Sequence, residues 1–329
     1  MKSLLRTLAA ATALTLPAIV GSGRVGAATP IGTTAAKVAP SYASFPDPWV
    51  LWDPGTALYW AYSTDQGSTN IPVMSSTDLV HWSAISDALP SLPSWASPPD
   101  TWAPSVARFG STWVMWYTAH DTALNMQCLS VATATAPGGR FTDSSTGPAI
   151  CQTSDGGSID PNITFIHSAP VLVWKSDDNS IGQPTHLWEA SLASSGLTTT
   201  SPPVELLSSG DPWQGGVIEG PTVATQGATA YLFYGANAYY SARSGIGYAT
   251  CTEVGNVPQC TNQSVTGPWF GTTGPIVGPQ GPTVFTDATG ALRLAFAAYD
   301  NCTPGSQGCT RALWIAHLSF VKGVPHLSQ

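Results

Sequence analysis

The chain has 329 residues, enough for two average domains or one large all-β domain. Its formal net charge is −8, and removing residues 1–28, which carry Lys2, Arg6 and Arg24, moves that charge to −11. Such an acidic surface is a poor electrostatic match to nucleic acid, so we expect no nucleic-acid partner. It suits an exported protein with a neutral ligand.

The N-terminal residues have the pattern of a secretory signal peptide. Lys2 and Arg6 precede an apolar run over residues 8–20, and small residues follow up to Ala28. This pattern predicts a signal peptide over residues 1–28 and a secreted protein. A membrane anchor is the alternative, but the run contains Pro17 and is shorter than a membrane span requires. No later segment is apolar enough to cross a membrane, so we expect no membrane association after cleavage.

Residues 29–43 are small and polar without periodicity, which predicts an N-terminal linker. After it, one construction recurs five times: a proline stands at the start of an apolar run, where the first strand residue need not donate to the ladder. The five prolines are Pro48, Pro104, Pro161, Pro221 and Pro282. The steps between them are 56, 57, 60 and 61 residues. A repeat of this length indicates a circular or stacked array.

Every repeat continues with further short strands. Second strands are expected at residues 58–63, 112–118, 170–174, 230–235 and 291–299, and third strands at residues 73–76, 128–132, 186–192, 247–251 and 312–318. Outer fourth strands are expected to begin at the loops 78–82, 137–141 and 266–269, each of which leads to an aromatic residue. Runs separated by short turns are typical of antiparallel hairpins. The sequence therefore predicts an all-β fold, a five-bladed β-propeller over residues 44–329. A stack of β-sandwiches would explain the strands but not the even spacing of the prolines.

The six cysteines form three pairs of near neighbours: Cys128/Cys151, Cys251/Cys260 and Cys302/Cys309. Six cysteines allow fifteen connectivities. In an exported chain we expect disulfides, and pairing of nearest neighbours is the least demanding choice. A zinc site is the competing interpretation, but no CxxC spacing supports it.

Three repeats carry a carboxylate at or beside the proline: Asp47, Asp160 and Glu219. The innermost strand of each propeller blade lines the central axis, so equivalent positions of different blades converge at one end of the channel. We therefore expect these carboxylates to meet around one pocket. A single Asp-Pro is better explained as a turn element, whereas three carboxylates at equivalent blade positions favour catalysis.

The ordered set of motifs resembles glycoside hydrolase family 43, the five-bladed propeller arabinanases, α-L-arabinofuranosidases and β-xylosidases. The matching pieces are Pro46-Asp47-Pro48, Thr101-Trp102-Ala103-Pro104, Ser158-Ile159-Asp160-Pro161, Ile218-Glu219-Gly220-Pro221, residues 77–82 and Gly323-Val324-Pro325. The resemblance implies that Asp47 is the general base, that Asp160 tunes and orients the acid, and that Glu219 is the general acid. An inverting glycosidase needs one carboxylate to activate water and one protonated carboxyl for the leaving oxygen. A third negative charge nearby raises the pKa of the acid.

Three more residues are candidates for substrate binding. Trp102 and Trp49 offer aromatic faces for a sugar ring, although packing inside a blade explains them as well. Arg311 lies where the resemblance implies an arginine that reaches the active site from the last blade. There it would hold the acid pair and a sugar hydroxyl, whereas the alternative is a surface strand residue.

One segment departs from the family pattern. Many members carry Gly-His before the inner strand of the fifth blade, and that histidine reaches the axis near a calcium ion or a water cluster. Here the segment is Gly278-Pro279-Gln280-Gly281-Pro282, and alignment by the proline puts Gly281 at the histidine position. An axial calcium is therefore in doubt, and we expect neither a metal site nor a cofactor.

The leading hypothesis is thus a secreted, monomeric, inverting glycoside hydrolase. Its substrate would be a poly- or oligosaccharide with arabinofuranosyl or xylosyl linkages. A non-catalytic sugar-binding propeller is one alternative, against which the complete carboxylate set argues. A retaining hydrolase of the invertase type is another. That type uses Asn-Asp-Pro and Arg-Asp-Pro motifs, whereas here Pro46 precedes Asp47 and Ile159 precedes Asp160.

Overall fold

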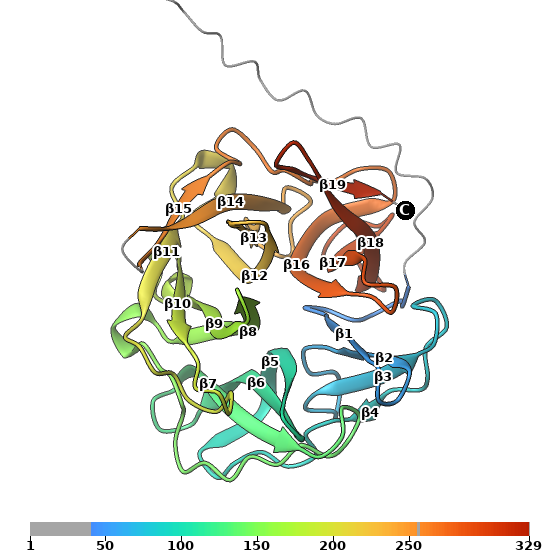
Figure 1. Cartoon of the computed structure of the whole chain (residues 1–329), viewed down its shortest axis with the longest axis vertical. Coiled ribbons are helices and arrows are strands. Elements are labelled where there is room, and N and C mark those ends of the chain that lie inside the picture. Colours follow the sequence, from blue (N-terminus) through green and yellow to red (C-terminus); the bar gives the residue numbers. More distant parts are fainter. Residues whose placement is uncertain (1–40, 255–256, 329) are drawn as a thin grey trace, which may run out of the picture. The chain divides into compact units, whose positions relative to one another are not determined.

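Five small antiparallel sheets follow one another along the chain, and each is one blade of a propeller (Figure 1). The structure is a computed structural model that describes residues 41–254 and 257–328. The strands of the first two blades are β1 (Trp49–Asp53), β2 (Leu58–Tyr62), β3 (Pro72–Ser76) and β4 (Ser86–Asp87), then β5 (Ala96–Phe109), β6 (Thr112–Asp121) and β7 (Met126–Ala134). Those of the third and fourth are β8 (Ser158–Ile166), β9 (Ala169–Ser176), β10 (His186–Ser191) and β11 (Val204–Ser208), then β12 (Ile218–Gln226), β13 (Thr229–Ala236), β14 (Gly245–Val254) and β15 (Val257–Asn262). The fifth blade holds β16 (Ile276–Thr286), β17 (Leu292–Asp300), β18 (Arg311–Val321) and β19 (Val324–Ser328).

The helical content of the described residues is three short 3-10 turns, η1 (Thr153–Asp155), η2 (Asp178–Ile181) and η3 (Pro212–Gln214). The first strand of each blade lies nearest the centre of the ring in Figure 1, and the later strands follow outward in chain order. The predicted all-β, five-bladed fold is confirmed. The predicted second and third strands each match a strand of the structure, with ends that differ by a few residues.

The predicted starts of the fourth strands hold in blade one, where Trp82 pairs with Ser76 and β4 follows the loop 78–82. After the other two loops the pairing with the third strand is one bridge each, Thr142 with Thr133 and Phe270 with Ile246; blade two has three strands, and the outer strand β15 of blade four comes before its loop. The aromatic residues after the loops of blades two and four also pack between blades. Phe141 is buried and meets the ring of Tyr62 in blade one, and the Trp269 indole donates to the Pro325 carbonyl in blade five. These rings therefore join neighbouring blades.

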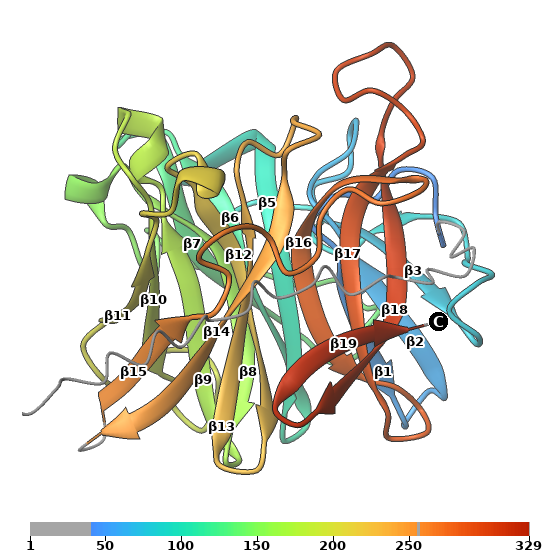
Figure 2. The same cartoon turned by 90° about the horizontal axis from the view of Figure 1, so that it is seen from above.

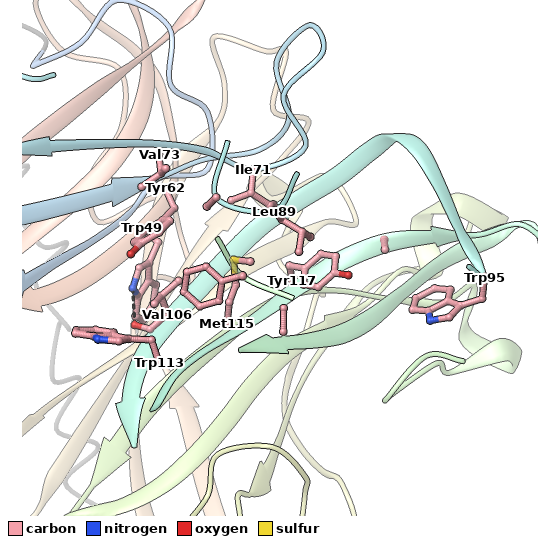
Figure 3. Packing of buried hydrophobic residues seen from close by; sticks show 14 residues of the cluster. Trp49, Tyr62, Ile71, Val73, Leu89, Trp95, Val106, Trp113, Met115 and Tyr117 are labelled. Atoms are coloured by element: carbon pink, nitrogen blue, oxygen red, sulfur yellow. Dashed lines mark hydrogen bonds between the residues drawn. The ribbon is translucent and has the colours of Figure 1, made fainter. Parts of the chain in front are cut away.

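The apolar residues gather in five clusters, one at each junction between neighbouring blades. Figure 3 shows the cluster between blades one and two, where the Trp49 indole donates to the Val106 carbonyl at 2.9 Å. The corresponding cluster between blades five and one contains Phe285 and Phe45. Burial of these side chains holds each blade to the next, at roughly 1.5–3 kcal/mol for a fully buried large side chain.

The ring is closed by the segment just before blade one. The Ser41 N–H donates to the Leu313 carbonyl at 2.7 Å, and the Leu313 N–H donates back to the Tyr42 carbonyl at 2.9 Å. The last residues of the predicted linker are therefore paired with β18. The predicted signal peptide, residues 1–28, and the linker up to residue 40 lie outside the described residues.

The three predicted disulfides are present in the structure. Cys251 and Cys260 are cross-strand partners on β14 and β15. The other two bridges are Cys128–Cys151 and Cys302–Cys309. The latter closes the loop between β17 and β18, which rises from one end of the propeller in Figure 2. None of the described helices is long and apolar enough to span a membrane.

The recurring prolines mark the start of the inner strand only in blade one, where Pro48 directly precedes β1. In blades two to five the proline lies inside the strand, where the pairing register shifts as in a β-bulge. The residue before each of the five prolines has a positive φ: 49° at Asp47, 44° at Ala103, 56° at Asp160, 55° at Gly220 and 58° at Gly281. A bulge tolerates a residue without an N–H and turns side chains away from the regular alternation. This bend places the candidate site.

Candidate active site

The candidate site is lined by two consecutive positions of the blades, the residue just before the recurring proline and the residue that precedes it. The residues just before the prolines include Asp47 and Asp160, whereas Glu219 lies one position earlier, beside Gly220. The prediction that all three carboxylates hold equivalent positions is therefore wrong by one residue. All three nevertheless line one cavity of about 520 Å³, which has the size of a small-molecule site. Trp49, Trp102 and Arg311 line the same cavity.

Asp47 is held from two sides as a hydrogen-bond acceptor. The Arg311 guanidinium donates to both carboxylate oxygens, at 2.7 and 3.2 Å, and the Thr64 hydroxyl donates to Oδ2 at 2.7 Å. Arg311 therefore binds Asp47 rather than the Asp160–Glu219 pair that the sequence had suggested. Burial alone would lower the pKa of Arg311, but the charge and hydrogen bonds of Asp47, together with the charges of Tyr299 and Glu219, raise it. These three hydrogen bonds fix the orientation of the Asp47 carboxylate toward the cavity.

Asp160 has the opposite environment. Its side chain accepts one hydrogen bond among the described residues, from the Gly220 N–H to Oδ2 at 2.9 Å. Burial and then the neighbouring charge of Glu219 raise the pKa of Asp160 to about 7. The sequence had predicted the raised pKa for Glu219. Asp160 and its neighbour Glu219 therefore hold a proton between them up to near neutral pH.

Lys175 is the functional candidate that sequence reasoning missed. Its ammonium lies 3.1 Å from Oε2 of Glu219 and 3.5 Å from Oδ1 of Asp177, and its side chain is 1% exposed. Burial alone would lower the pKa of Lys175, but Glu219, Asp160 and Asp177 together raise it, so the group is charged. A lysine in the otherwise apolar run of β9, in a chain with three lysines after residue 28, was the available signal.

The aromatic candidates differ in their surroundings. Trp102 is half-buried on β5 and lines the cavity. Trp49 is only 8% exposed and belongs to the core between blades one and two, so packing accounts for most of its surface. Tyr239, which the sequence did not single out, also lines the cavity, and the Arg311 guanidinium lies 4.8 Å above its ring. The next residue, Tyr240, stands edge-to-face against Tyr239 and is 64% exposed.

The residues at the expected axial-metal position do not fit a histidine-held ion. Gly281 lies so close to Asp47 that a Cβ on it would stand 3.2 Å from the Asp47 Cα and 3.3 Å from Oδ1. The Gln280 amide donates to the carbonyls of Ala236 and Asn237, at 3.1 and 2.7 Å. Among the described residues, no three His, Cys, Asp or Glu side chains are grouped to hold a metal ion. We therefore derive no step through an axial metal.

Comparison with known proteins shows which family has this sequence and which solved structures have this fold. The family model for glycosyl hydrolases family 43 matches residues 40–325. A thermostable family-43 glycoside hydrolase is 24% identical, with a TM-score of 0.75, over 87% of this chain and 93% of that one. An α-L-arabinofuranosidase from Lactobacillus brevis is 18% identical, with a TM-score of 0.73, over 88% and 95%.

An endo-arabinase from Bacteroides thetaiotaomicron is 19% identical, with a TM-score of 0.68, over 87% of this chain and 98% of that one. A comparison with curated proteins gives no match. At these identities the similar structures support only the fold, and the match to the family model shows that the chain belongs to the family. The propeller, its bulged inner strands and the matched sequence together identify the chain as a member of glycosyl hydrolases family 43.

Proposed function

We propose that this protein is a secreted, inverting glycoside hydrolase that cleaves arabinofuranosyl or xylosyl linkages of poly- or oligosaccharides. The observation that carries the proposal is the contrast between the carboxylates of one cavity. Asp47 receives three hydrogen bonds from Arg311 and Thr64, whereas Asp160 is buried beside Glu219 with one backbone donor. The cavity thus offers a carboxylate that takes a proton and a pair that keeps one.

The proposed reaction uses Asp47 as the base and Glu219, beside Asp160, as the acid. Asp47 removes a proton from a water molecule as the water attacks the anomeric carbon. Glu219 donates a proton to the leaving oxygen, so the glycosidic bond breaks with inversion at that carbon. Asp160 holds the Gly220 backbone beside Glu219 and keeps a proton within the pair at neutral pH. Asp47 and Glu219 come from blades one and four, with blade five between them. This leaves room for the water between Asp47 and the sugar.

The sugar and the location are inferred from the similar structures, the N-terminal sequence and the disulfides. The similar structures include an arabinofuranosidase and an endo-arabinase, which motivates the choice of pentose linkages. Secretion is supported by the signal-peptide pattern of residues 1–28 and by three disulfides, which persist in oxidising compartments.

Hydrolysis assays test the proposal directly. Purified protein should be tested on aryl arabinofuranosides, aryl xylosides, arabinan and arabinoxylan. Asp47→Asn, Asp160→Asn and Glu219→Gln should each lower kcat/KM by about 10²-fold or more. Glu205→Gln is the matched control, because Glu205 lies on the outer strand β11 away from the cavity and should leave the rate unchanged.

The leaving group separates acid from base. Glu219→Gln should be partly spared on substrates with good leaving groups, because such groups need little protonation. Equal loss on activated and natural substrates would contradict the assignment of Glu219. Binding of oligosaccharides without hydrolysis of any substrate would favour the non-catalytic propeller.

A further inference from the structure

The position of Lys175 has counterparts in blades one and two, and there it has a structural task. In blades four and five the same position holds Gly235 and Ala297, which have no hydroxyl.

In blade two, the residue of the second strand that lies opposite Trp102, two positions before the proline, is Thr118. In blade one, Thr64 lies just after β2, and its N–H donates to the carbonyl of Pro46, the residue two positions before the proline. Each threonine hydroxyl accepts a backbone N–H of the next blade: Thr64 from Ala103 and Thr118 from Asp160, both at 3.1 Å. Lys175 is the blade-three equivalent, opposite Ile159.

Blade three lacks this hydrogen bond: both the backbone N–H and the side chain that would form it have other partners. The backbone N–H of Gly220, which a threonine hydroxyl at position 175 would accept, donates instead to the Asp160 carboxylate at 2.9 Å. The lysine extends to the Glu219 side chain, with its ammonium at 3.1 Å from Oε2. A link between blades therefore does not require a lysine here, since a threonine makes that link in blades one and two. The cation needs another explanation.

The chemistry of an ammonium group determines which oxygen of Glu219 can carry a proton. Lysine has three donors and no acceptor, so Oε2 must offer it a lone pair. A protonated Glu219 therefore carries its hydrogen on Oε1. The Lys175 side chain is 1% exposed and that of Glu219 is 16% exposed, so bulk water does not replace this contact.

We propose that Lys175 is a positioning residue for the general acid: it directs the proton of Glu219 to Oε1 and sets the pH above which the cavity loses that proton. The inference rests on the proposed glycosidase function. It adds to that function a charge outside the carboxylate set, on a strand that carries none of the predicted motifs.

The charges around Glu219 give the direction of the pH effect. Lys175 on β9 faces Glu219 on β12, Asp160 on β8 and Asp177 just after β9, while Arg311 on β18 is engaged by Asp47. Without Lys175, the carboxylates nearest Glu219 would repel one another with no adjacent cation. They would bind a proton more tightly, because Lys175 lowers the pKa of Asp160. The alkaline limb of activity should therefore move to higher pH.

Three substitutions test the inference. Lys175→Thr supplies the residue of the first two blades, Lys175→Met fills the space without charge, and Lys175→Arg keeps the cation. We expect the alkaline limb of kcat/KM to rise by about one pH unit or more in the Thr and Met variants and to stay near the wild-type position in Lys175→Arg. On substrates with poor leaving groups kcat should fall at least about tenfold, with less loss on good ones and little change in KM.

The outcomes are distinct. An unchanged alkaline limb in folded Thr and Met variants, or equal loss for good and poor leaving groups, would overturn the proposal. A Lys175→Thr protein that does not fold would make the lysine a structural residue and would overturn it as well. If the wild-type protein hydrolysed none of the glycosides, the proposed function itself would be wrong. That result is obtained without the variants, so the two failures can be distinguished.

Discussion

Replacing Asp160 by asparagine should stabilise the protein at pH 8 but not at pH 4. Burial, and then repulsion by Glu219, raises the pKa of Asp160 from 3.8 to about 7. Asparagine never ionises, and its side-chain oxygen can still accept the hydrogen bond of the Gly220 N–H. The variant therefore removes the charge and keeps the contact.

The sign and size follow from the two pKa values. Because the folded-state pKa lies above the unfolded one, the wild-type protein is penalised progressively as the pH rises from about 4 to about 7. A tenfold change in proton affinity corresponds to about 1.4 kcal/mol, so the full penalty is about 4 kcal/mol. Structural relaxation and water entry reduce it. We expect Asp160→Asn to gain at least about 1 kcal/mol in free energy of unfolding at pH 8.

Urea unfolding followed by tryptophan fluorescence at pH 4, 6 and 8 measures this gain. Asp287→Asn is the control of opposite sign. Although burial opposes it, hydrogen bonds from Thr289 and Arg293 hold the pKa of Asp287 well below its ordinary range. Its contribution is therefore present near neutral pH and is lost as the pH falls. A gain for Asp160→Asn that is the same at pH 4 and pH 8, or a loss at pH 8, would refute the reasoning.

Three further substitutions probe the surroundings of the cavity. Arg311→Met should lower stability by about 2 kcal/mol and lower kcat/KM strongly, because Asp47 loses two hydrogen bonds and its counter-charge; thermal melts and kinetics check both. Gly281→Ala should displace Asp47 and lower kcat, whereas Gly267→Ala, with no atom within 4 Å of its added Cβ, should change nothing measurable. Tyr240→Ala should raise KM for oligosaccharides but not for aryl monosaccharides, because its exposed ring offers a stacking face beyond the cavity. Equal KM changes for both substrates would contradict that role.

Much of the fold could be predicted because one physical device repeats. The inner strands of blades two to five each contain a proline at a bulge, and a residue without an N–H is visible in the sequence wherever a bulge tolerates it. The outer strands of blades two and four could not be placed in the same way. The aromatic residues Phe141 and Trp269 carry the same apolar signal whether they pair in a sheet or fill the junction between two blades, and here they fill junctions.

The candidate site divides along the same line. The carboxylates lie beside the prolines, so the repeat predicted their convergence, and only the one-residue offset of Glu219 was missed. Lys175 comes from a second strand and Thr64 from the residues just after one, and pairing across to the inner segment of the blade sets their place rather than a motif. An alignment of the second strands would have pointed to Lys175. Lys175 follows an aromatic residue, Trp174, in the same way as Thr118 follows Tyr117 in blade two. Tyr239 lies on a loop whose course the sequence does not specify.

The anomeric configuration of the first-formed product tests the mechanism most directly. Proton NMR of an aryl glycoside digest, recorded before the free sugar equilibrates, distinguishes the two anomers. Attack by a water activated by Asp47, with protonation by Glu219 across the cavity, predicts a product of inverted configuration. A first-formed product that retains the configuration of the substrate would make Asp47 a nucleophile and would contradict the account, even if every carboxylate variant were inactive.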